Sequence, residues 1–422
     1  MSPADTGAVA ATRANARART QAATTADDRL RPGSPGYRRA NLALFAAGLA
    51  TFALLYSTQA LLPALSSGLS LSPARASLTV SATTAALAVA LLPVSALSEK
   101  YGRTPVMTAS VFAASLLALA VPFAPNPAVL VALRAVQGVA LAGLPATAMA
   151  YLAEEVHPAA VPSAIGLYVA GNSIGGMSSR VVGGVLSEAF GWRAALFAVG
   201  LSALACAVAF RLLVPPARHF TPGPVHPAAL WRTVTGHLGD PLLRGLYAIG
   251  LLFMAVFGAV YTVLGYRLTA APFGLSQTAV GAIFLVYLVG TAASAASGAL
   301  LARTGLRGAF TVAAVLCAAG LLLTLSSLAL ILLGLVLVTA GFFTGHSAAS
   351  GAVSRTALTG RAQASALYLT AYYIGNSLGG TLGAGAFHAG GWGATVSLAL
   401  ATVGAVGLVA GLALRRPGAA TP

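Results

Sequence analysis

"LYVAGNSIGGMSSRVVGGVL", residues 167–186, is a run of small and apolar residues with a single charged side chain, an arginine, inside it. Its beginning, "GLYVAGNSIGG" at 166–176, returns as "YYIGNSLGG" at 372–380. The Gly-Trp pair at 191–192 also returns, at 391–392. An apolar segment that recurs in the second half of a chain indicates two structurally similar halves.

The composition of the chain is that of a membrane protein. Of 422 residues, 58% are hydrophobic and 8% are charged, whereas about a quarter of the residues in a soluble domain are charged. Apolar segments of about 20 residues, the length that spans a bilayer, recur throughout. The fold class is therefore an all-α polytopic membrane protein with two pseudo-symmetric six-helix halves, a pattern typical of transporters with parallel repeats. We predict twelve transmembrane helices, at about 40–64, 74–97, 105–123, 128–152, 162–187, 192–214, 243–264, 277–301, 308–326, 328–350, 363–386 and 392–414.

The chain divides into five parts at the ends of these apolar segments. The connection between the sixth and seventh helices is rich in proline and holds three histidines. The first residues are rich in Ala, Arg, Thr and Pro and have no apolar core, which is typical of a disordered tail and not of a cleavable signal. The predicted parts are a cytoplasmic tail (1–38), an N-terminal half (39–214), a cytoplasmic linker (215–242), a C-terminal half (243–414) and a C-terminal tail (415–422).

The formal net charge of +16 indicates topology and not binding to nucleic acid. If both termini are cytoplasmic and the helices alternate, 19 of the 24 Lys and Arg residues lie on the cytoplasmic side, three lie outside and two lie within helices. Lys and Arg accumulate in cytoplasmic loops of membrane proteins. We therefore predict a multi-pass protein of the cell inner (plasma) membrane, in contact with the lipid bilayer, with both termini cytoplasmic.

Two motifs in the N-terminal half resemble the major facilitator superfamily. Residues 95–103, Ser-Ala-Leu-Ser-Glu-Lys-Tyr-Gly-Arg, are similar to the family's Gly-x-Leu-x-Asp-Arg-x-Gly-Arg loop between helices 2 and 3. Residues 134–138, Arg-Ala-Val-Gln-Gly, are similar to its Arg-x-x-Gln-Gly motif in helix 4. Phrases such as "GNSIGGMSSR" and "SALYLTAYYIGNSLGG" resemble the YnfM-type, arabinose-efflux-permease-like subgroup, and the resemblance covers the chain after its tail.

The resemblance implies a secondary active transporter that exports a small molecule as a monomer. The expected mechanism is rocker-switch alternating access coupled to protons. One departure favours an alternative: the helix 5 antiporter motif expects proline where this chain has Gly176. Uptake or facilitated diffusion of an anionic metabolite or sugar is therefore a second hypothesis. A non-transporting membrane receptor or scaffold is a third, from another class.

The resemblance also implies which side chains face the transport cavity, because helices 1, 4, 7 and 10 line it in this fold. Helices 5 and 11 add two asparagines at matching places in the repeat and one arginine. The candidate substrate-binding residues are Tyr56, Gln59, Arg134, Gln137, Asn172, Arg180, Tyr261, His346 and Asn376.

Charged residues within the predicted helices are candidates for function, because charge is costly in lipid. Arg134 and Arg180 lie at similar depths, whereas all eight acidic residues fall in the tail, in loops or near helix ends. We therefore expect a substrate that is anionic, or polar and neutral. The alternative is that each arginine snorkels outward to the membrane surface or pairs structurally with Glu188, which lies two turns after Arg180. His346 is the first candidate for carrying protons, and its alternative is a packing role with a bond to Ser or Thr.

Two further sets of residues are predicted to serve motion and packing. In the loop between helices 2 and 3, Glu99 is expected to accept hydrogen bonds from Arg103, or to cap a helix of the opposite half in one conformation. The predicted gating residues are Glu99, Lys100, Gly102 and Arg103. Small residues spaced four apart let helices approach closely in lipid. The predicted packing residues are Gly171, Gly175, Gly176, Gly375, Gly379 and Gly380.

The sequence contains no motif for catalysis or for cofactor binding. It has no Gly-x-x-x-x-Gly-Lys-Ser/Thr loop for ATP and no Cys/His spacing for a metal. Its two cysteines, Cys206 and Cys317, fall in apolar segments and indicate buried hydrophobic side chains. We therefore predict no enzyme activity, no metal site and no cofactor.

Overall fold

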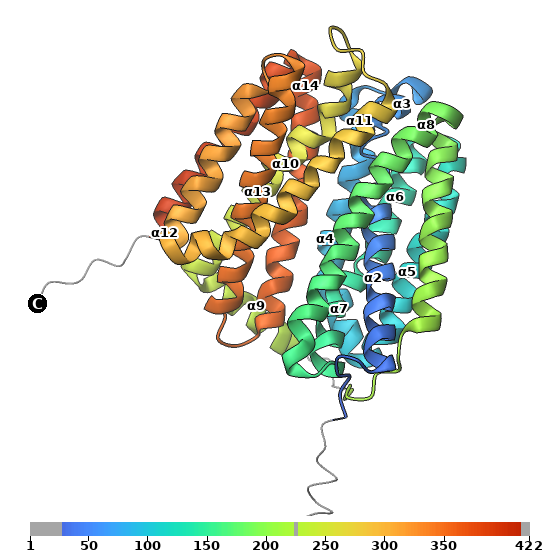
Figure 1. Ribbon diagram of the computed structural model, residues 1–422, viewed down its shortest axis with the longest axis vertical. Helices are drawn as coiled ribbons and strands as arrows, with labels where there is room; N and C mark the ends of the chain where they lie inside the picture. The colour runs from blue at the N-terminus through green and yellow to red at the C-terminus, as the bar shows by residue number, and fades with distance from the viewer. Residues whose placement is uncertain (1–27, 223–226, 415–422) are drawn as a thin grey trace, which may run out of the picture.

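The computed structural model describes residues 28–222 and 227–414. Within these ranges the regular structure is helical, apart from one isolated β-bridge between Leu30 and Val156. One helical bundle comes from the first part of the chain and the other from the second, and the two lie side by side (Figure 1). The predicted tail at 415–422, and the tail at 1–38 except for residues 28–38, lie outside the described residues.

The helices of the N-terminal half begin where the sequence supplies caps. Ser34, Ser72 and Asn126 each accept a hydrogen bond from the backbone N–H three residues on. Each is followed by proline at the first helical position, which suits the fixed φ of that residue. The helices are α2 (Pro35–Tyr56), α3 (Leu62–Leu69), α4 (Pro73–Tyr101), α5 (Arg103–Ala120), α6 (Pro127–Leu141), α7 (Gly143–Glu155) and α8 (Val161–Leu213), with short 3₁₀ helices η1 (Val121–Phe123) and η2 (Pro158–Ala160).

The C-terminal half follows a helix within the predicted linker. This helix, α9 (Pro227–Gly239), precedes Asp240, whose carboxylate caps the next helix through the backbone N–H groups of Leu242 and Leu243. Ser276 caps its helix in the same way. The helices are α10 (Pro241–Thr269), α11 (Gln277–Ile283), η3 (Phe284–Val286), α12 (Tyr287–Leu323), α13 (Leu328–Thr356) and α14 (Arg361–Ala413).

Sharp turns at glycines divide three of the longest helical stretches. Nine stretches in the described ranges are long and apolar enough to cross a membrane. Three of them hold two spans each, because α8, α12 and α14 break at Gly191 (φ 83°), Gly305 (φ 68°) and Gly391 (φ 69°). A positive φ of this kind favours glycine. After two of the breaks, Trp192 and Trp392 are buried at equivalent positions. The prediction of twelve spans in two similar halves is confirmed.

The first helix of each half packs closely against the fifth. At Gly171 of α8, a Cβ would lie 2.5 Å from the carbonyl oxygen of Phe45 in α2. At Gly175, Gly375 and Gly379 a facing backbone carbonyl likewise occupies the place of a Cβ. The glycines therefore let α2 meet α8, and α10 meet α14, backbone against backbone.

Helices α4 and α14 join the two halves along their length. Ser377 donates a hydrogen bond to the carbonyl of Ser81 (2.9 Å), and Thr381 donates one to its hydroxyl (2.8 Å). Gly380 lies between these two residues of α14, and a Cβ there would lie 3.4 Å from the Ser81 hydroxyl. Because the Thr262 hydroxyl of α10 would lie 3.1 Å from the same Cβ, this glycine packs between its own half and the opposite one.

Further contacts between the halves lie at the end of the bundle away from the described chain ends. The Tyr266 hydroxyl donates to the Leu62 carbonyl (2.9 Å), and the backbone N–H of Thr278 donates to Glu188 (2.9 Å). We call this end the far end. The opposite end, which carries residues 28 and 414 and the α4–α5 loop, is the terminal face. The halves are thus closed together at the far end.

Candidate functional site

A cavity of about 370 Å³ lies between the two halves, and we call it the central cavity. Its walls come from α2, α7 and α8 on one side and from α10, α12, α13 and α14 on the other. Met149 and Ser350 line it toward the terminal face, each six residues before the end of its helix, α7 or α13. Nine of its twenty lining residues are Phe or Tyr. The aromatic lining residues are Phe52, Tyr56, Tyr168, Phe257, Tyr287, Phe342, Phe343, Tyr372 and Tyr373.

Arg180 supplies the central cavity with a buried positive charge. Its side chain is 1% exposed. Its Nε donates to Gln59 Oε1 (3.0 Å), Nη2 donates to the same oxygen, and Nη1 donates to the Gly176 carbonyl. The guanidinium carbon lies 4.4 Å from the ring centroid of Tyr56 and 5.1 Å from that of Tyr287. Since a guanidinium has five N–H groups, this arrangement leaves two for a ligand.

The alternative pairing of Arg180 with Glu188 is wrong. Glu188 instead accepts a hydrogen bond from Thr278 at the start of α11, in the opposite half. No carboxylate contacts Arg180 in the part of the chain that the structure describes. The positive charge is therefore balanced by amide and carbonyl dipoles and by aromatic faces, and by no formal negative charge.

Arg134 is equally buried but lies in a different environment. Its Nε donates to the Thr79 carbonyl (2.9 Å), and Nη1 and Nη2 donate to the carbonyls of Leu54 and Leu55 (both 2.9 Å). Gln137 Oε1 accepts a further bond from Nη1 (2.5 Å). Neither Arg134 nor Gln137 lines the central cavity. The arginine joins the end of α2 to α4 and α6, so its geometry is that of a structural clamp.

The other predicted binding residues divide in the same way. Tyr56, Asn172 and His346 line the central cavity, whereas Gln59, Tyr261 and Asn376 do not. Gln59 reaches it through Arg180. Tyr261 instead bonds to the Thr339 hydroxyl (2.6 Å). The structure therefore unites residues from α2, α8 and α13 in one site and leaves five of the nine predicted residues outside the cavity lining.

His346 makes packing contacts of the kind its alternative role expects, but its hydrogen-bond partner is a tyrosine and not Ser or Thr. Its Nδ1 lies 2.9 Å from the Tyr368 hydroxyl. Its ring stacks on Phe342 at 5.9 Å and 12°, and lies 4.8 Å from the Tyr372 ring. The histidine thus belongs to the aromatic wall of the C-terminal half.

Two tyrosines in the cavity wall were missed by the reasoning from sequence. The hydroxyls of Tyr168 and Tyr287 are buried and have no hydrogen-bond partner among the described residues. Buried hydroxyls are normally bonded, so these two are available to a ligand. Tyr168 comes four residues before Asn172 in the quoted segment, one turn away on the same face, and this spacing could have indicated it.

The predicted gate loop has a different acceptor from the one expected. Arg103 donates to Glu154 at the end of α7 (Nη2 to Oε1, 3.0 Å) and to the Ser98 hydroxyl (2.7 Å), so the expected bond to Glu99 is wrong. The reason is Gly102, whose φ of 96° ends α4 and makes Arg103 the first residue of α5. Lys100 lies over the ring of its neighbour Tyr101, with 5.1 Å between Nζ and the ring centroid.

A second polar cluster ties the beginning of the described chain to the linker. The backbone N–H of His219 donates to Glu155 (2.8 Å), and its ring nitrogens lie 3.0 Å from Glu155 Oε2 and 2.7 Å from Asp28 Oδ1. The bond to Asp28, and then the bond to Glu155, raise the pKa of His219. The same bond lowers the pKa of Asp28. Glu155, the last residue of α7, is thus engaged in this cluster.

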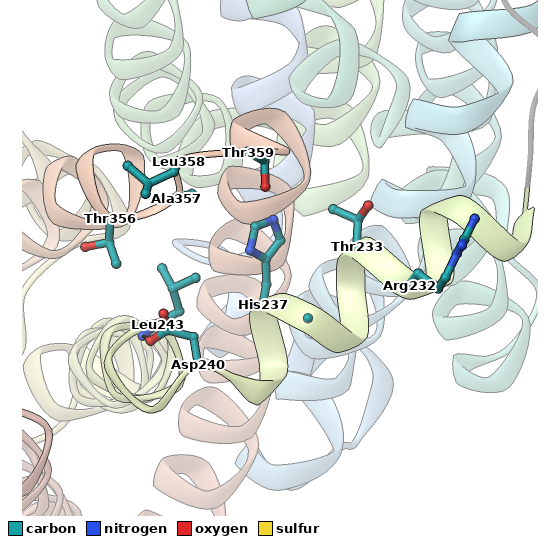
Figure 2. A pocket seen from close by; sticks show the side chains of 10 residues that line it. Arg232, Thr233, His237, Asp240, Leu243, Thr356, Ala357, Leu358 and Thr359 are labelled. Atoms are coloured by element: carbon teal, nitrogen blue, oxygen red, sulfur yellow. Dashed lines mark hydrogen bonds between the residues drawn. The ribbon is translucent and has the colours of Figure 1, made fainter.

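A second hollow opens at the terminal face between α9, the start of α10 and the segment after α13 (Figure 2). Its volume is about 610 Å³, and its ionisable side chains are Arg232, His237 and Asp240. Asp240 is occupied as a helix cap, and His237 Nε2 lies 3.1 Å from the Gly360 carbonyl. These contacts make the hollow the joint between the linker and the C-terminal half.

Twelve spans in two similar halves, with an aromatic cavity between them, define a multi-pass membrane transporter and not an enzyme. The chain belongs to the Major Facilitator Superfamily, whose family profile matches residues 42–357. It is 42% identical to the uncharacterized MFS-type transporter YybF of Bacillus subtilis over 86% of this chain and 89% of that protein. It is 41% identical to the inner membrane transport protein YnfM of Escherichia coli over 92% and 93%, respectively.

Solved structures show the same fold at low sequence identity. A bacterial homologue of the human lysosomal transporter Spinster, in an inward-facing and unoccupied conformation, superposes with a TM-score of 0.73 at 17% identity, covering 90% of this chain and 98% of that one. The nucleoside transporter NupG superposes with a TM-score of 0.73 at 13% identity, covering 89% and 100%. The predicted fold and family are confirmed.

Proposed function

We propose that this transporter carries a small organic anion with an aromatic or otherwise apolar body. The observation that carries the proposal is Arg180, a buried cation in the central cavity without a carboxylate partner among the described residues. A bound anion would accept hydrogen bonds from the two remaining N–H groups of Arg180 and offset its positive charge. The aromatic walls would enclose the apolar body, and the Tyr168 and Tyr287 hydroxyls would bond polar substituents.

The mechanism that suits this architecture is rocker-switch alternating access by a monomer. Both halves contribute to one central cavity, and they are closed together at the far end. The charge distribution of the sequence supports a cytoplasmic terminal face in a bacterial inner membrane. In that orientation the structure represents the inward-facing state, and rocking about the cavity would open the far end.

Export in exchange for protons is the transport mode that the resemblance to efflux permeases favours. His346 is the group lining the cavity, within the described residues, that titrates nearest neutral pH in its unperturbed form. A second candidate mode is uptake or facilitated diffusion of the same anion. It is favoured by a specific observation: no carboxylate lines the described cavity to exchange a proton against substrate.

The experiment is transport by the purified protein in proteoliposomes. The probes are para-hydroxybenzoate, its neutral amide and the cation tyramine, each with and without a pH gradient. We expect flux of the anion, a large loss in Arg180→Ala, and no loss in the control Arg303→Ala, whose side chain is exposed. Transport of tyramine alone, with Arg180→Ala unaffected, would overturn the proposed substrate class. A rate that is unchanged when the gradient is dissipated would remove proton coupling and favour facilitated diffusion.

A further inference from the structure

Gln59 holds the charged group of the central cavity without lining the cavity itself. It lies in the turn between α2 and α3, is 3% exposed, and its Oε1 accepts hydrogen bonds from two nitrogens of Arg180. A carboxylate would be the usual partner for two parallel N–H groups of an arginine. Here the acceptor is a neutral amide, which orients the guanidinium and leaves its charge in place.

The second buried arginine shows that this arrangement is specific to the cavity. Arg134 also has a glutamine partner, Gln137, but three backbone carbonyls surround it as well and it does not face the cavity. Four of its five N–H groups thereby have acceptors within the protein. Arg180 has one carbonyl and one amide oxygen as acceptors, its two remaining N–H groups have no acceptor among the described residues, and the residue lines the central cavity.

The turn that carries Gln59 is itself fixed by the other arginine. The N–H of Gln59 donates to the Tyr56 carbonyl (3.0 Å), directly after the two carbonyls of Leu54 and Leu55 that Arg134 binds. A chain of contacts therefore runs from Arg134 to the turn, from the turn to Gln59, and from Gln59 to Arg180. Such support restricts the side chain to one orientation.

We propose that Gln59 is the positioning residue that sets the charge preference of the cavity. Its amide fixes the direction of the Arg180 guanidinium, and its neutrality keeps the cavity selective for anions. The inference rests on the proposed function, because it concerns the same site. A glutamate of nearly the same shape would form an ion pair with Arg180 and remove the charge that a substrate anion needs.

The test compares Gln59→Glu and Gln59→Leu with the matched control Gln137→Glu, which places the same carboxylate beside the arginine outside the cavity. The first readout is the affinity of the detergent-purified protein for para-hydroxybenzoate relative to its neutral amide. We expect Gln59→Glu to lower this ratio at least tenfold, which equals about 1.4 kcal/mol. The ratio should stay within about twofold of wild type in Gln137→Glu, which is below 0.5 kcal/mol on the same scale.

The second readout needs no ligand and separates this inference from the proposed function. Arg180 gains a counter-charge in Gln59→Glu, whereas it loses its hydrogen-bond acceptor in Gln59→Leu. The unfolding midpoint should therefore be higher in Gln59→Glu than in Gln59→Leu. If the wild type binds no aromatic carboxylate but this order holds, the substrate class is wrong and the uncompensated charge of Arg180 stands. If the glutamate variant is the less stable, or folds well and keeps its preference for the anion, the role of Gln59 is overturned.

Discussion

Adding one methyl group at Gly171 should push the first and fifth helices of the N-terminal half apart. An ideal Cβ at this position would lie 2.5 Å from the carbonyl oxygen of Phe45 and 3.0 Å from its Cα. Carbon and carbonyl oxygen normally approach to about 3.3–3.6 Å, so α2 would have to move by roughly 0.8–1.1 Å. Because these contacts are with backbone, no side-chain rotation can relieve them.

The matched control is Gly166→Ala in the same helix, where a Cβ would meet nothing within 4 Å. Both changes gain the same helix propensity, about 0.5–1 kcal/mol for alanine over glycine. Their difference therefore isolates the contact with α2. Forcing a methyl group into a packed interface costs about 1–3 kcal/mol, so Gly171→Ala should be less stable than Gly166→Ala by about that amount.

The assay is unfolding of both detergent-purified variants, followed by intrinsic tryptophan fluorescence. Anion flux in proteoliposomes provides the functional readout. It should fall in Gly171→Ala, because α2 and α8 carry Tyr56 and Arg180 on the two sides of this contact. If Gly171→Ala unfolds at the same midpoint as Gly166→Ala, or at a higher one, the close approach of these helices is refuted.

Two further perturbations test motion and pH dependence. Gly281→Val should open the far end, because a Cβ at Gly281 would lie 2.6 Å from a backbone carbonyl of α8. Spin labels on α8 and α11 should report a longer distance between these helices. The control Gly298→Val, where a Cβ meets nothing within 4 Å, should leave that distance unchanged. Asp28 and Glu155 raise the pKa of His219. Protonated His219 therefore stabilises the attachment of residues 28–30 to the end of α7 and to the linker. This stabilisation is complete below the pKa that His219 has in the unfolded chain, and it is lost as pH rises through the raised pKa. Hydrogen exchange of the Leu30 amide, corrected for its intrinsic rate, should accelerate over that pH range. The same acceleration in His219→Gln would contradict the role of His219.

Much of the fold could be predicted from single segments of the sequence. The transfer of an apolar helix into lipid depends on its own residues, so length and hydrophobicity identified the spans. Gly191 and Gly391 could be recognised as equivalent because each precedes a tryptophan in the repeat. The cost of a buried charge likewise indicated Arg134 and Arg180 as candidates.

The candidate site depended on contacts between distant segments. From the sequence, Arg134 and Arg180 are two similar buried cations. In the structure they differ, because carbonyls at the end of α2 bind Arg134, whereas Arg180 is bound by Gln59 and lines the cavity. Arg103 likewise donates to Glu154 of another helix, α7, and not to Glu99 of its own loop. The amino-acid sequence alone is enough to show which segments enter the membrane and that they form two similar halves, because hydrophobicity and helix-breaking are local properties. Which charge remains open to a ligand depends on the packing of the helices, because a hydrogen bond requires two groups from different helices to meet at a short distance and in a suitable direction.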